Sequence, residues 1–322
     1  MSGPIIITGV AGFIGSHVAE ALLERGERVV GVDNFDAMYG RDRKEANLAE
    51  LHKITHRGAF DFIEADFTNA PAMFELARRV RPGGVVHLGA RAGVRRSIED
   101  PIGYAHVNVT GTAVMLEAAR QGGASRMVIA SSSSVYGNNV KTPFSEEDDV
   151  GAPISPYAAT KRACELIAHT HWHLTTMPTA CLRFFTVFGP RQRPDLAMMS
   201  FFERLRRGET ITMFGDGSTS RDYTYIDDIV AGVLAAYDRV PEFGFRVWNL
   251  GGNHPVSLRE MIAAVGTAAA IEPRIERKPM QPGDVERTWA DLSRSSRELG
   301  YTPRTSLADG LAKQWAWLTR RG

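Results

Sequence analysis

Cysteine is scarce in this chain of 322 residues, which contains only Cys164 and Cys181. Two thiols cannot form the disulfide framework of a small secreted domain or a zinc site made of cysteines. Long apolar runs are missing too, and none approaches the roughly 18 residues that a membrane-spanning helix requires. The amino-terminal stretch lacks the basic segment and the cleavage site of a secretory signal. We therefore expect a cytoplasmic protein.

Neither sign of charge predominates, because 38 basic side chains offset 37 acidic ones and leave a formal net charge of +1. This balance gives no electrostatic footprint for nucleic acid or for an anionic membrane surface, so neither is an expected partner. Hydrophobic residues make up 43% of the chain, which excludes general disorder. At roughly 150 residues per domain, the length corresponds to about two domains.

Short apolar runs alternate with amphipathic stretches through the first half of the chain. The runs predict strands over residues 4–8, 28–33, 60–66, 85–89 and 126–131. The stretches between them predict helices over residues 16–23, 70–80, 104–121 and 156–174. Strands that alternate with helices indicate a parallel sheet covered on both faces, which is an α/β fold of the doubly wound Rossmann type.

The pattern loosens after about residue 182, where glycine and proline become frequent. We expect residues 1–182 to form the Rossmann-type domain, with a return segment near residues 223–247. Residues 183–322 are then expected to form a smaller C-terminal α/β lobe.

Residues 8–16, with the sequence TGVAGFIGS, lie between a predicted strand and a predicted helix. Gly9 and Gly12 allow a tight turn and a close approach of the backbone to a pyrophosphate, and Gly15 lets the helix pack against the strand. The amino terminus of the helix offers unpaired N–H groups to the negative charge. This context predicts a dinucleotide site, so residues 1–182 are expected to be the dinucleotide-binding domain and residues 183–322 the lobe that binds the substrate.

Asp33 ends the next predicted strand, 18 residues after Gly15. A carboxylate there can accept hydrogen bonds from the adenosine ribose and would repel a 2′-phosphate, so NAD is favoured over NADP. Asp66 ends the third strand and is either a partner of the adenine amino group or a residue that opens a loop. The other candidate cofactor residues are neighbours of the glycine loop and of the strand ends: Phe13, Ile14, Asn34, Phe67, Leu88 and Ala90.

Tyr157 and Lys161 are four residues apart on a predicted helix, so they share one face. An ordinary phenol becomes an effective base near neutral pH only if its phenolate gains roughly 4 kcal/mol of stabilisation, for which a neighbouring ammonium and the positive charge of an oxidised nicotinamide are the obvious sources. Ser132 lies in a run of four serines at the end of the fifth strand, on the sheet edge where such folds bind ligands. Tyr157, Lys161 and Ser132 are the predicted catalytic residues.

Together these motifs resemble the NAD-dependent epimerase/dehydratase family of extended short-chain dehydrogenases/reductases. Within this family the chain is most similar to the UDP-glucuronate 4-epimerases, and the similarity runs from Ile5 to about Trp317. Motifs in the second half carry it as well: residues 183–190 (RFFTVFGP), 215–217 (GDG), 220–223 (SRDY), 225–228 (YIDD) and 282–284 (PGD).

The resemblance implies an internal redox cycle on a UDP-sugar. Tyr157 would take the proton of the 4-hydroxyl while hydride passes from C4 to tightly held NAD, and hydride would return to the other face of the 4-ketose. Lys161 would hold the nicotinamide ribose and favour the phenolate, and Ser132 would orient the hydroxyl. No metal ion is expected, although three histidines cluster at positions 169, 171 and 173.

Three positions favour glucuronate as the sugar. Ser133 and Ser134 stand where dehydratases of the family carry an Asp-Glu pair and UDP-xylose synthases a Glu, and Thr186 stands where glucose/galactose epimerases usually have Asn. The 4-keto form of glucuronate is a β-keto acid that loses CO₂ readily, so an epimerase must fix the carboxylate. Ser133, Ser134 and Thr186 are the candidate anchors, with Arg95, Arg96 or Arg193 as candidate counter-charges.

Further contacts are implied by the resemblance alone. Arg221 is the expected diphosphate ligand, and Gln281 replaces a second arginine, for which Arg287 is a nearby candidate. The remaining expected substrate residues are Met213 and Phe214 beside the uracil, and Asp284. The helices over residues 104–121 and 156–174 would form a homodimer. Three alternatives stay open: a UDP-glucose or UDP-N-acetylglucosamine 4-epimerase, a UDP-glucuronate decarboxylase, and a catalytically silent NAD-binding scaffold.

Overall fold

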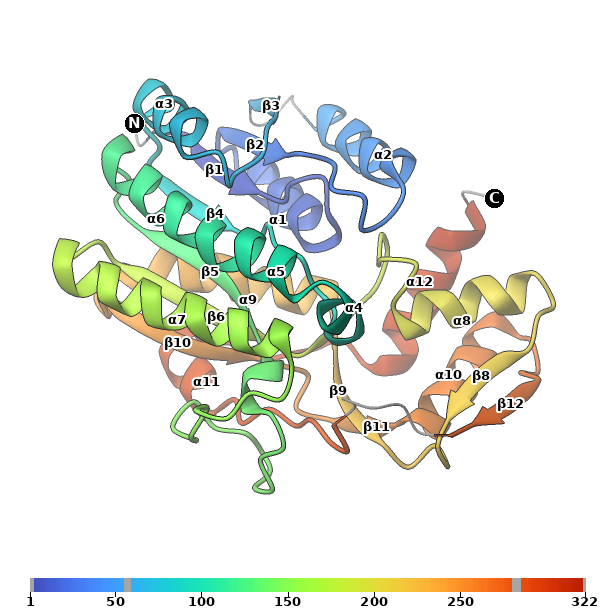
Figure 1. Cartoon of the computed structure of the whole chain (residues 1–322). Coiled ribbons are helices and arrows are strands. Elements are labelled where there is room, and N and C mark those ends of the chain that lie inside the picture. Colours follow the sequence, from blue (N-terminus) through green and yellow to red (C-terminus); the bar gives the residue numbers. More distant parts are fainter. Residues whose placement is uncertain (1–2, 55–58, 280–284, 321–322) are drawn as a thin grey trace. The chain divides into compact units, whose positions relative to one another are not determined.

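The computed structural model describes residues 3–54, 59–279 and 285–320 (Figure 1). The chain divides into two compact units. The first unit comprises Met1–Gly137, Asp149–Arg183 and Val230–Trp248, and the second comprises Asn138–Asp148, Phe184–Ile229 and Asn249–Gly322. Residues 138–148 therefore belong to the second unit although the segments before and after them belong to the first, and the sequence gives no signal for this change. Among the described residues, no helix has the length and apolar character needed to cross a membrane.

A seven-stranded sheet forms the centre of the first unit, in the order β10-β6-β5-β4-β1-β2-β3. Strand β1 pairs in parallel with β2 on one side and with β4 on the other, so the strand order reverses between β1 and β4. This order confirms the predicted Rossmann-type α/β fold. The strands are β1 Ile5–Thr8, β2 Val29–Asp33, β3 Phe60–Glu64, β4 Gly84–His87, β5 Met127–Ser132, β6 Thr179–Phe184 and β10 Phe245–Leu250.

Helices cover both faces of this sheet (Figure 1). On one face α3 (Ala70–Val80), α6 (Gly111–Gly122) and α7 (Pro156–Thr175) enclose an apolar core that includes Met73, Met115, Ile129 and Ala168. On the other face lie α1 (Phe13–Glu24), α2 (Arg41–His52) and the first unit's part of α9 (Ile226–Arg239). Burial on both faces explains why β1, β2, β4 and β5 are apolar at successive positions.

The helix predicted over residues 104–121 is not uniform. It consists of the end of α5 (Pro101–Tyr104), a π-helical segment η1 (Ala105–Thr110) and α6, and α4 (Val94–Glu99) precedes it. Asn108 lies in the middle of η1 and is 1% exposed. A π-helical turn accommodates an extra residue and often occurs at functional sites, and here it turns a polar side chain inward.

The second unit contains two small sheets and four helices among its described residues. Strands β7 (Thr186–Phe188), β9 (Ser220–Tyr225) and β11 (Pro255–Ser257) form one sheet, and β8 (Ile211–Phe214) pairs with β12 (Ile275–Lys278) in the other. The helices are α8 (Ala197–Arg206), α10 (Leu258–Ala269), α11 (Ser293–Leu299) and α12 (Leu307–Arg320). Two short 3₁₀ turns, η2 (Ser133–Tyr136) and η3 (Val240–Glu242), belong to the first unit.

Candidate active site

The glycine loop between β1 and α1 forms a tight backbone turn. Gly9 has a φ of +70°, which L side chains rarely adopt, and its carbonyl accepts a hydrogen bond from the Gly12 N–H at 3.0 Å. Helix α1 begins with Phe13 and Ile14, directly after Gly12, and no side chain caps its first turn. The first N–H groups of α1 can therefore donate to a phosphate at the positive end of the helix dipole.

Gly15 allows the first turn of α1 to lie close to the loop, because a Cβ at this position would lie 2.1 Å from the Gly9 carbonyl oxygen. We expect Gly15→Ala to displace the loop and to weaken NAD binding at least about tenfold, as measured by calorimetric titration. Gly123→Ala is the matched control, since a Cβ there meets nothing within 4 Å although its φ of +75° is strained. Equal NAD affinities of the two variants would contradict the role of the loop.

Asp33 lies at the end of β2 and is 6% exposed. Its Oδ2 accepts a hydrogen bond from the Ala11 N–H at 3.2 Å, and its Oδ1 accepts one from the Phe35 N–H at 2.8 Å. The buried Lys44 ammonium lies 3.5 Å from Oδ1 and donates to the carbonyl of Asp36 at 3.0 Å. These donors fix the orientation of the carboxylate beside the glycine loop. Lys44 is a contact that the sequence reasoning missed.

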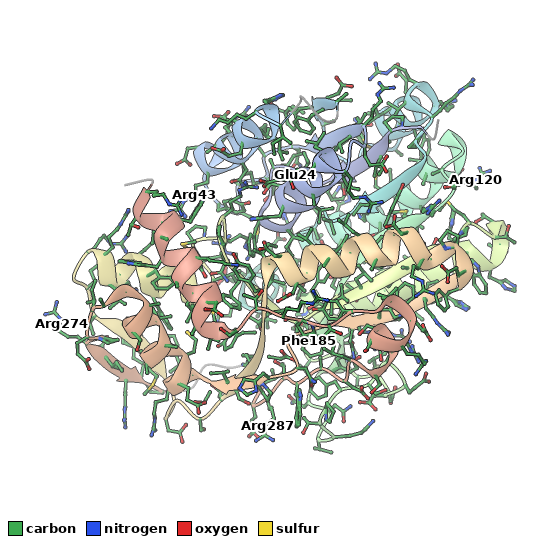
Figure 2. All side chains as sticks on the ribbon, turned by 180° about the vertical axis from the view of Figure 1, so that it is seen from behind. Glu24, Arg43, Arg120, Phe185, Arg274 and Arg287 are labelled. Carbon is green, nitrogen blue, oxygen red and sulfur yellow. The ribbon has the colours of Figure 1, made fainter. Side chains whose placement is uncertain are left out.

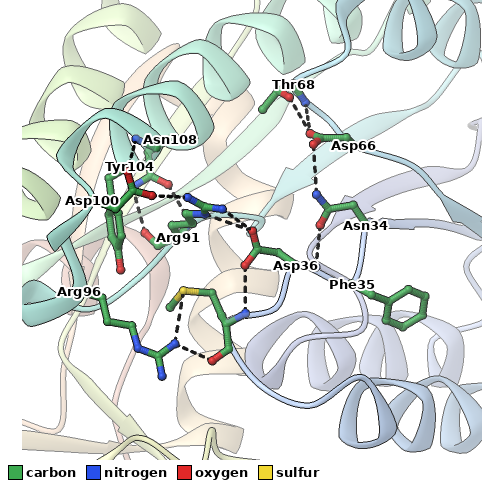
Figure 3. A network of polar contacts seen from close by, with 12 residues as sticks. Asn34, Phe35, Asp36, Asp66, Thr68, Arg91, Arg96, Asp100, Tyr104 and Asn108 are labelled. Atoms are coloured by element: carbon green, nitrogen blue, oxygen red, sulfur yellow. Dashed lines mark hydrogen bonds and ion pairs between the residues drawn. The ribbon is translucent and has the colours of Figure 1, made fainter.

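Asn34 and Asp66 follow neighbouring strands, and the structure brings them together: Asn34 Nδ2 donates to Asp66 Oδ2 at 3.2 Å (Figure 3). Asp66 Oδ1 accepts hydrogen bonds from the backbone N–H and the hydroxyl of Thr68 at 2.8 and 2.7 Å. Burial opposes ionisation, but the donors from Thr68 and Asn34 hold the pKa of Asp66 below its ordinary value. Asp66 is thus a charged hydrogen-bond acceptor, held within a turn that follows the carboxyl end of β3.

The remaining predicted cofactor residues differ in accessibility. Leu88 and Ala90 are half-buried in the loop after β4. Phe67 is 6% exposed and packs edge-on against the His87 ring, with 5.1 Å between centroids, so its side chain belongs to the core. Burial lowers the pKa of His87 to about 3, and the charge of Lys161 acts in the same direction. The imidazole is therefore neutral.

Ser132 is the last residue of β5 and caps the turn η2. Its Oγ accepts a hydrogen bond from the Ser134 N–H at 3.2 Å and donates to the Ser134 Oγ at 3.1 Å. Ser133 lies between them in the same turn. The turn thus presents several short hydroxyl groups at the carboxyl end of a central strand.

Tyr157 and Lys161 occupy the first two turns of α7, which is capped by the Ser155 hydroxyl accepting the Ala158 N–H at 3.1 Å. Lys161 is 4% exposed, and its Nζ donates to the Ala130 carbonyl of β5 at 2.7 Å. This bond fastens α7 beside the strand that ends in Ser132. The glycine loop, Asp33 and Lys161 belong to one unit, and their donors and acceptors could hold the phosphates, a ribose and the ring end of a dinucleotide.

A buried ion pair supports this arrangement, and the sequence reasoning did not identify it. Glu165, one turn after Lys161, receives two hydrogen bonds from Arg183 of β6, each at 2.9 Å. The Ser131 hydroxyl donates to Glu165 Oε1 at 2.6 Å, and Arg183 Nη1 donates to the Tyr136 hydroxyl at 2.9 Å. The Glu165 carboxylate therefore joins α7, β5 and β6 and, through Arg183, the serine turn η2 (Ser133–Tyr136).

The second unit holds two predicted substrate residues on one small sheet. Thr186 is the first residue of β7, in register with Tyr223 of the parallel strand β9. Arg221 precedes Tyr223 by two residues, and its Nη1 donates to the carbonyls of Ser220 and Glu286 at 2.9 and 3.4 Å. The guanidinium is thus held by backbone groups at the start of β9.

The predicted uracil residues lie on the other sheet of this unit. Met213 is 2% exposed, and Phe214, the last residue of β8, is half-buried. Both are paired with β12. Asp284 and Gln281 lie outside the described residues.

The other candidate arginines are in different environments. Arg95 is exposed on α4, and Arg96 Nη1 donates to a backbone carbonyl of the loop after β2 at 2.6 Å. Arg193 forms a two-point ion pair with Asp195 at 3.0 and 2.7 Å, which offsets its charge. Arg287 lies at an exposed position beside the start of β9 (Figure 2).

Comparison with known proteins identifies the family of this chain. Residues 6–314 match the family described as GDP-mannose 4,6 dehydratase. A UDP-glucuronate 4-epimerase of Thermodesulfobacterium geofontis is 38% identical over 316 residues, which cover 98% of this chain and 96% of the relative.

Two solved structures are similar as well. The UDP-glucuronic acid 4-epimerase of Bacillus cereus, in complex with UDP-glucuronic acid and NAD, superposes with a TM-score of 0.92 at 34% identity, covering 99% of this chain and 100% of the other. The UDP-glucose 4-epimerase of Thermotoga maritima with UDP-glucose has a TM-score of 0.89 at 30% identity and covers 99% of each chain. The chain therefore belongs to the GDP-mannose 4,6-dehydratase family of epimerases and dehydratases.

Proposed function

We propose that this chain is an NAD-dependent epimerase that inverts C4 of UDP-glucuronate to give UDP-galacturonate. One arrangement carries the proposal: the Tyr157 and Lys161 face of α7 is fastened to β5, which ends at Ser132, in the unit that also holds the glycine loop. The similar proteins from Thermodesulfobacterium geofontis and Bacillus cereus support the choice of glucuronate.

When bound, NAD supplies a ring that takes a hydride from the sugar C4 and returns it. Tyr157 removes the proton of the C4 hydroxyl as the ketone forms and gives the proton back when the hydroxyl is restored. Lys161 stabilises the phenolate through its charge, and the Ala130 carbonyl fixes its position. Ser132 orients the C4 oxygen by a hydrogen bond. General acid–base catalysis of this kind contributes about 10²–10⁴-fold to a rate.

The serine turn favours epimerisation over elimination and over decarboxylation. Elimination of water across C5 and C6 needs an acid–base group beside Ser132. The hydroxyls of Ser133 and Ser134 are neither acids nor bases near neutral pH. Hydroxyl donors can instead hold the glucuronate carboxylate so that the C5–C6 bond stays out of alignment with the ketone. Ser133, Ser134 and Thr186 are the proposed anchors, and Arg221 is the proposed diphosphate ligand.

The test is product analysis by NMR. Purified protein is incubated with UDP-glucuronate without added NAD, and in parallel with UDP-glucose and UDP-N-acetylglucosamine. We expect UDP-galacturonate to form from the acidic sugar and the two neutral sugars to remain unchanged. Conversion of UDP-glucose would favour the alternative that the Thermotoga maritima relative represents. Release of CO₂ with a UDP-pentose would identify a decarboxylase.

We also propose a homodimer that forms through α5, η1 and α7. Ile102 is 83% exposed and Leu166 is 53% exposed, and Ala105 and Ala159 are exposed on the same helices. Exposed apolar side chains on neighbouring helices suit a two-fold contact with a second copy. Leu166→Glu should convert a dimer into a monomer in analytical ultracentrifugation, whereas Val140→Glu, at a 98% exposed position of the second unit, should leave the mass unchanged. A monomeric wild type would contradict the dimer.

We propose that the protein acts in the cytoplasm. Cys164 and Cys181 are both buried free thiols, which is typical of a reducing compartment. Fractionation of cells that express the tagged chain tests the location, and recovery with the exported or membrane fraction would contradict it.

A further inference from the structure

An ion-pair bridge joins two loops of the first unit that flank the end of β1 (Figure 3). One loop follows β2 and carries Asp36, and the other follows β4 and carries Arg91. Arg91 Nε and Nη2 donate to Asp36 Oδ2 at 3.1 and 3.0 Å, and Arg91 Nη1 donates to Asp100 Oδ2 at 2.7 Å. Because β1 lies between β2 and β4 in the sheet, the bridge spans the end of the strand that leads into the glycine loop.

The bridge is anchored on the β2 side by local hydrogen bonds. Asn34 Oδ1 accepts the Asp36 N–H at 3.0 Å, and Asp36 Oδ1 accepts the Met38 N–H at 3.0 Å. Arg96 forms a second link, since its Nη1 donates to the Met38 carbonyl at 2.6 Å. The side chains of Arg91 and Asp36 are 29% and 25% exposed, so water screens their attraction less than that of an open surface pair.

On the β4 side of the bridge, the backbone of Arg91 is connected to α7, the helix that carries Tyr157. Its N–H donates to Asn108 Oδ1 at 2.8 Å, and its carbonyl accepts from Asn108 Nδ2 at 3.0 Å. Asn108 Nδ2 also donates to the Thr160 hydroxyl at 3.0 Å, and this hydroxyl donates to the Tyr157 carbonyl at 2.8 Å. The π-helical segment η1 thus places one amide between the bridge and the turn of α7 that carries Tyr157.

A dinucleotide in a doubly wound sheet binds at the carboxyl ends of the strands where the strand order reverses, here between β1 and β4. The Asp36–Arg91 bridge crosses that edge. We infer that Asp36 and Arg91 form a clasp that retains NAD throughout the catalytic cycle, with Arg91 as a positioning residue. The inference rests on the proposed function, because an epimerase must return the hydride that it removed and therefore has to keep the same cofactor molecule throughout the cycle.

The test measures NAD release directly and needs no sugar. Protein loaded with radiolabelled NAD is mixed with a large excess of unlabelled NAD, and the bound label is followed by rapid filtration. We expect Arg91→Gln and Asp36→Asn each to release label about tenfold faster than the wild type, since each removes a partly shielded two-point charge contact. The double variant should release no faster than Arg91→Gln, because Asp36 has already lost its partner in that single variant.

Arg25→Gln is the matched control. Arg25 also forms a two-point ion pair, with Asp238 at 3.0 and 3.1 Å, but this pair joins the end of α1 to the end of α9. Its loss should leave the NAD release rate unchanged. The thermal unfolding temperatures of the cofactor-free variants should match that of the control variant, which separates faster release from general destabilisation.

Two outcomes would overturn the inference, and they can be distinguished. Wild-type release rates in both Arg91→Gln and Asp36→Asn would overturn the clasp and leave the proposed function intact. A wild-type protein that does not retain labelled NAD at all would overturn the clasp together with the proposed resident cofactor.

Discussion

Replacing Tyr157 by phenylalanine is expected to lower kcat about 10³-fold, in the range that removal of a general acid–base group costs. The change deletes only the hydroxyl and keeps the ring, which packs edge-on against Tyr104 with 6.3 Å between centroids. The variant should therefore fold and bind NAD as the wild type does. The rate is measured as formation of UDP-galacturonate from saturating UDP-glucuronate, and NAD content is measured on the same sample.

Tyr237→Phe is the control for this substitution. Tyr237 is also a tyrosine of the first unit, but it is buried and lies against Gly84 at the start of β4, away from the carboxyl ends of the strands. Its kcat should stay within about threefold of the wild type, the scale of a substitution outside the site. A Tyr157→Phe enzyme that remained as active as Tyr237→Phe would eliminate Tyr157 as the base.

Replacing Arg183 by methionine is expected to lower the free energy of unfolding by about 3–5 kcal/mol at about pH 7, as measured by chemical denaturation. The side chains of Arg183 and Glu165 are 2% and 1% exposed. Methionine fills part of the same volume but leaves the Glu165 carboxylate buried without its two-point partner. Because Glu165 also binds the Ser131 hydroxyl, we expect the variant to lose activity even under conditions where it remains folded.

The dependence on pH separates this electrostatic effect from a packing defect. Burial opposes ionisation of Glu165, but Arg183, Ser131 and Arg162, whose Nη1 donates to Oε2 at 3.0 Å, hold the pKa of this carboxyl below its ordinary value. The stability that it contributes in the wild type is fully present above the ordinary glutamate pKa and is lost only as the pH falls through the lowered value. Without Arg183, only Ser131 and Arg162 still favour the ionised form against burial, so the pKa of Glu165 should be higher than in the wild type. Protonation then removes the buried charge of the variant. Its stability deficit should therefore be smaller at about pH 5 than at about pH 7.

Two variants complete the test of the ion pair. Glu165→Gln combined with Arg183→Met removes both charges and should recover part of the lost stability at about pH 7. Arg239→Met breaks an exposed pair with Glu242 in the same unit and should cost no more than about 1 kcal/mol. A deficit of Arg183→Met that does not change with pH would assign the effect to packing alone.

The fold and the dinucleotide features could be predicted from the sequence because their signals are local. The apolar strand runs, the spacing of Gly9, Gly12 and Gly15, and the position of Asp33 are each encoded within a short stretch. The helix that carries Tyr157 and Lys161 is encoded in the same way. By contrast, the sequence predicts one uniform helix over residues 104–121 and gives no signal for the π-helical segment η1 within it.

The contacts that stabilise the site could not be predicted, because their partners are far apart in the sequence. Asp36 and Arg91 are 55 residues apart, and each reads alone as an exposed loop charge. Glu165 and Arg183 are 18 residues apart, and only the pairing of α7 with the sheet shows that they bury each other's charge. Such pairs depend on how the elements pack, which neither composition nor periodicity records.

The central claim is that Tyr157 moves a proton while the hydride of C4 leaves the sugar and comes back within the same active site. It is tested most directly with UDP-glucuronate that carries deuterium at C4, incubated with the enzyme in ordinary water. We predict that the deuterium stays on C4 of the UDP-galacturonate product, because hydride held on a resident cofactor does not exchange with solvent. Epimerisation that replaces this deuterium by solvent hydrogen would contradict the account.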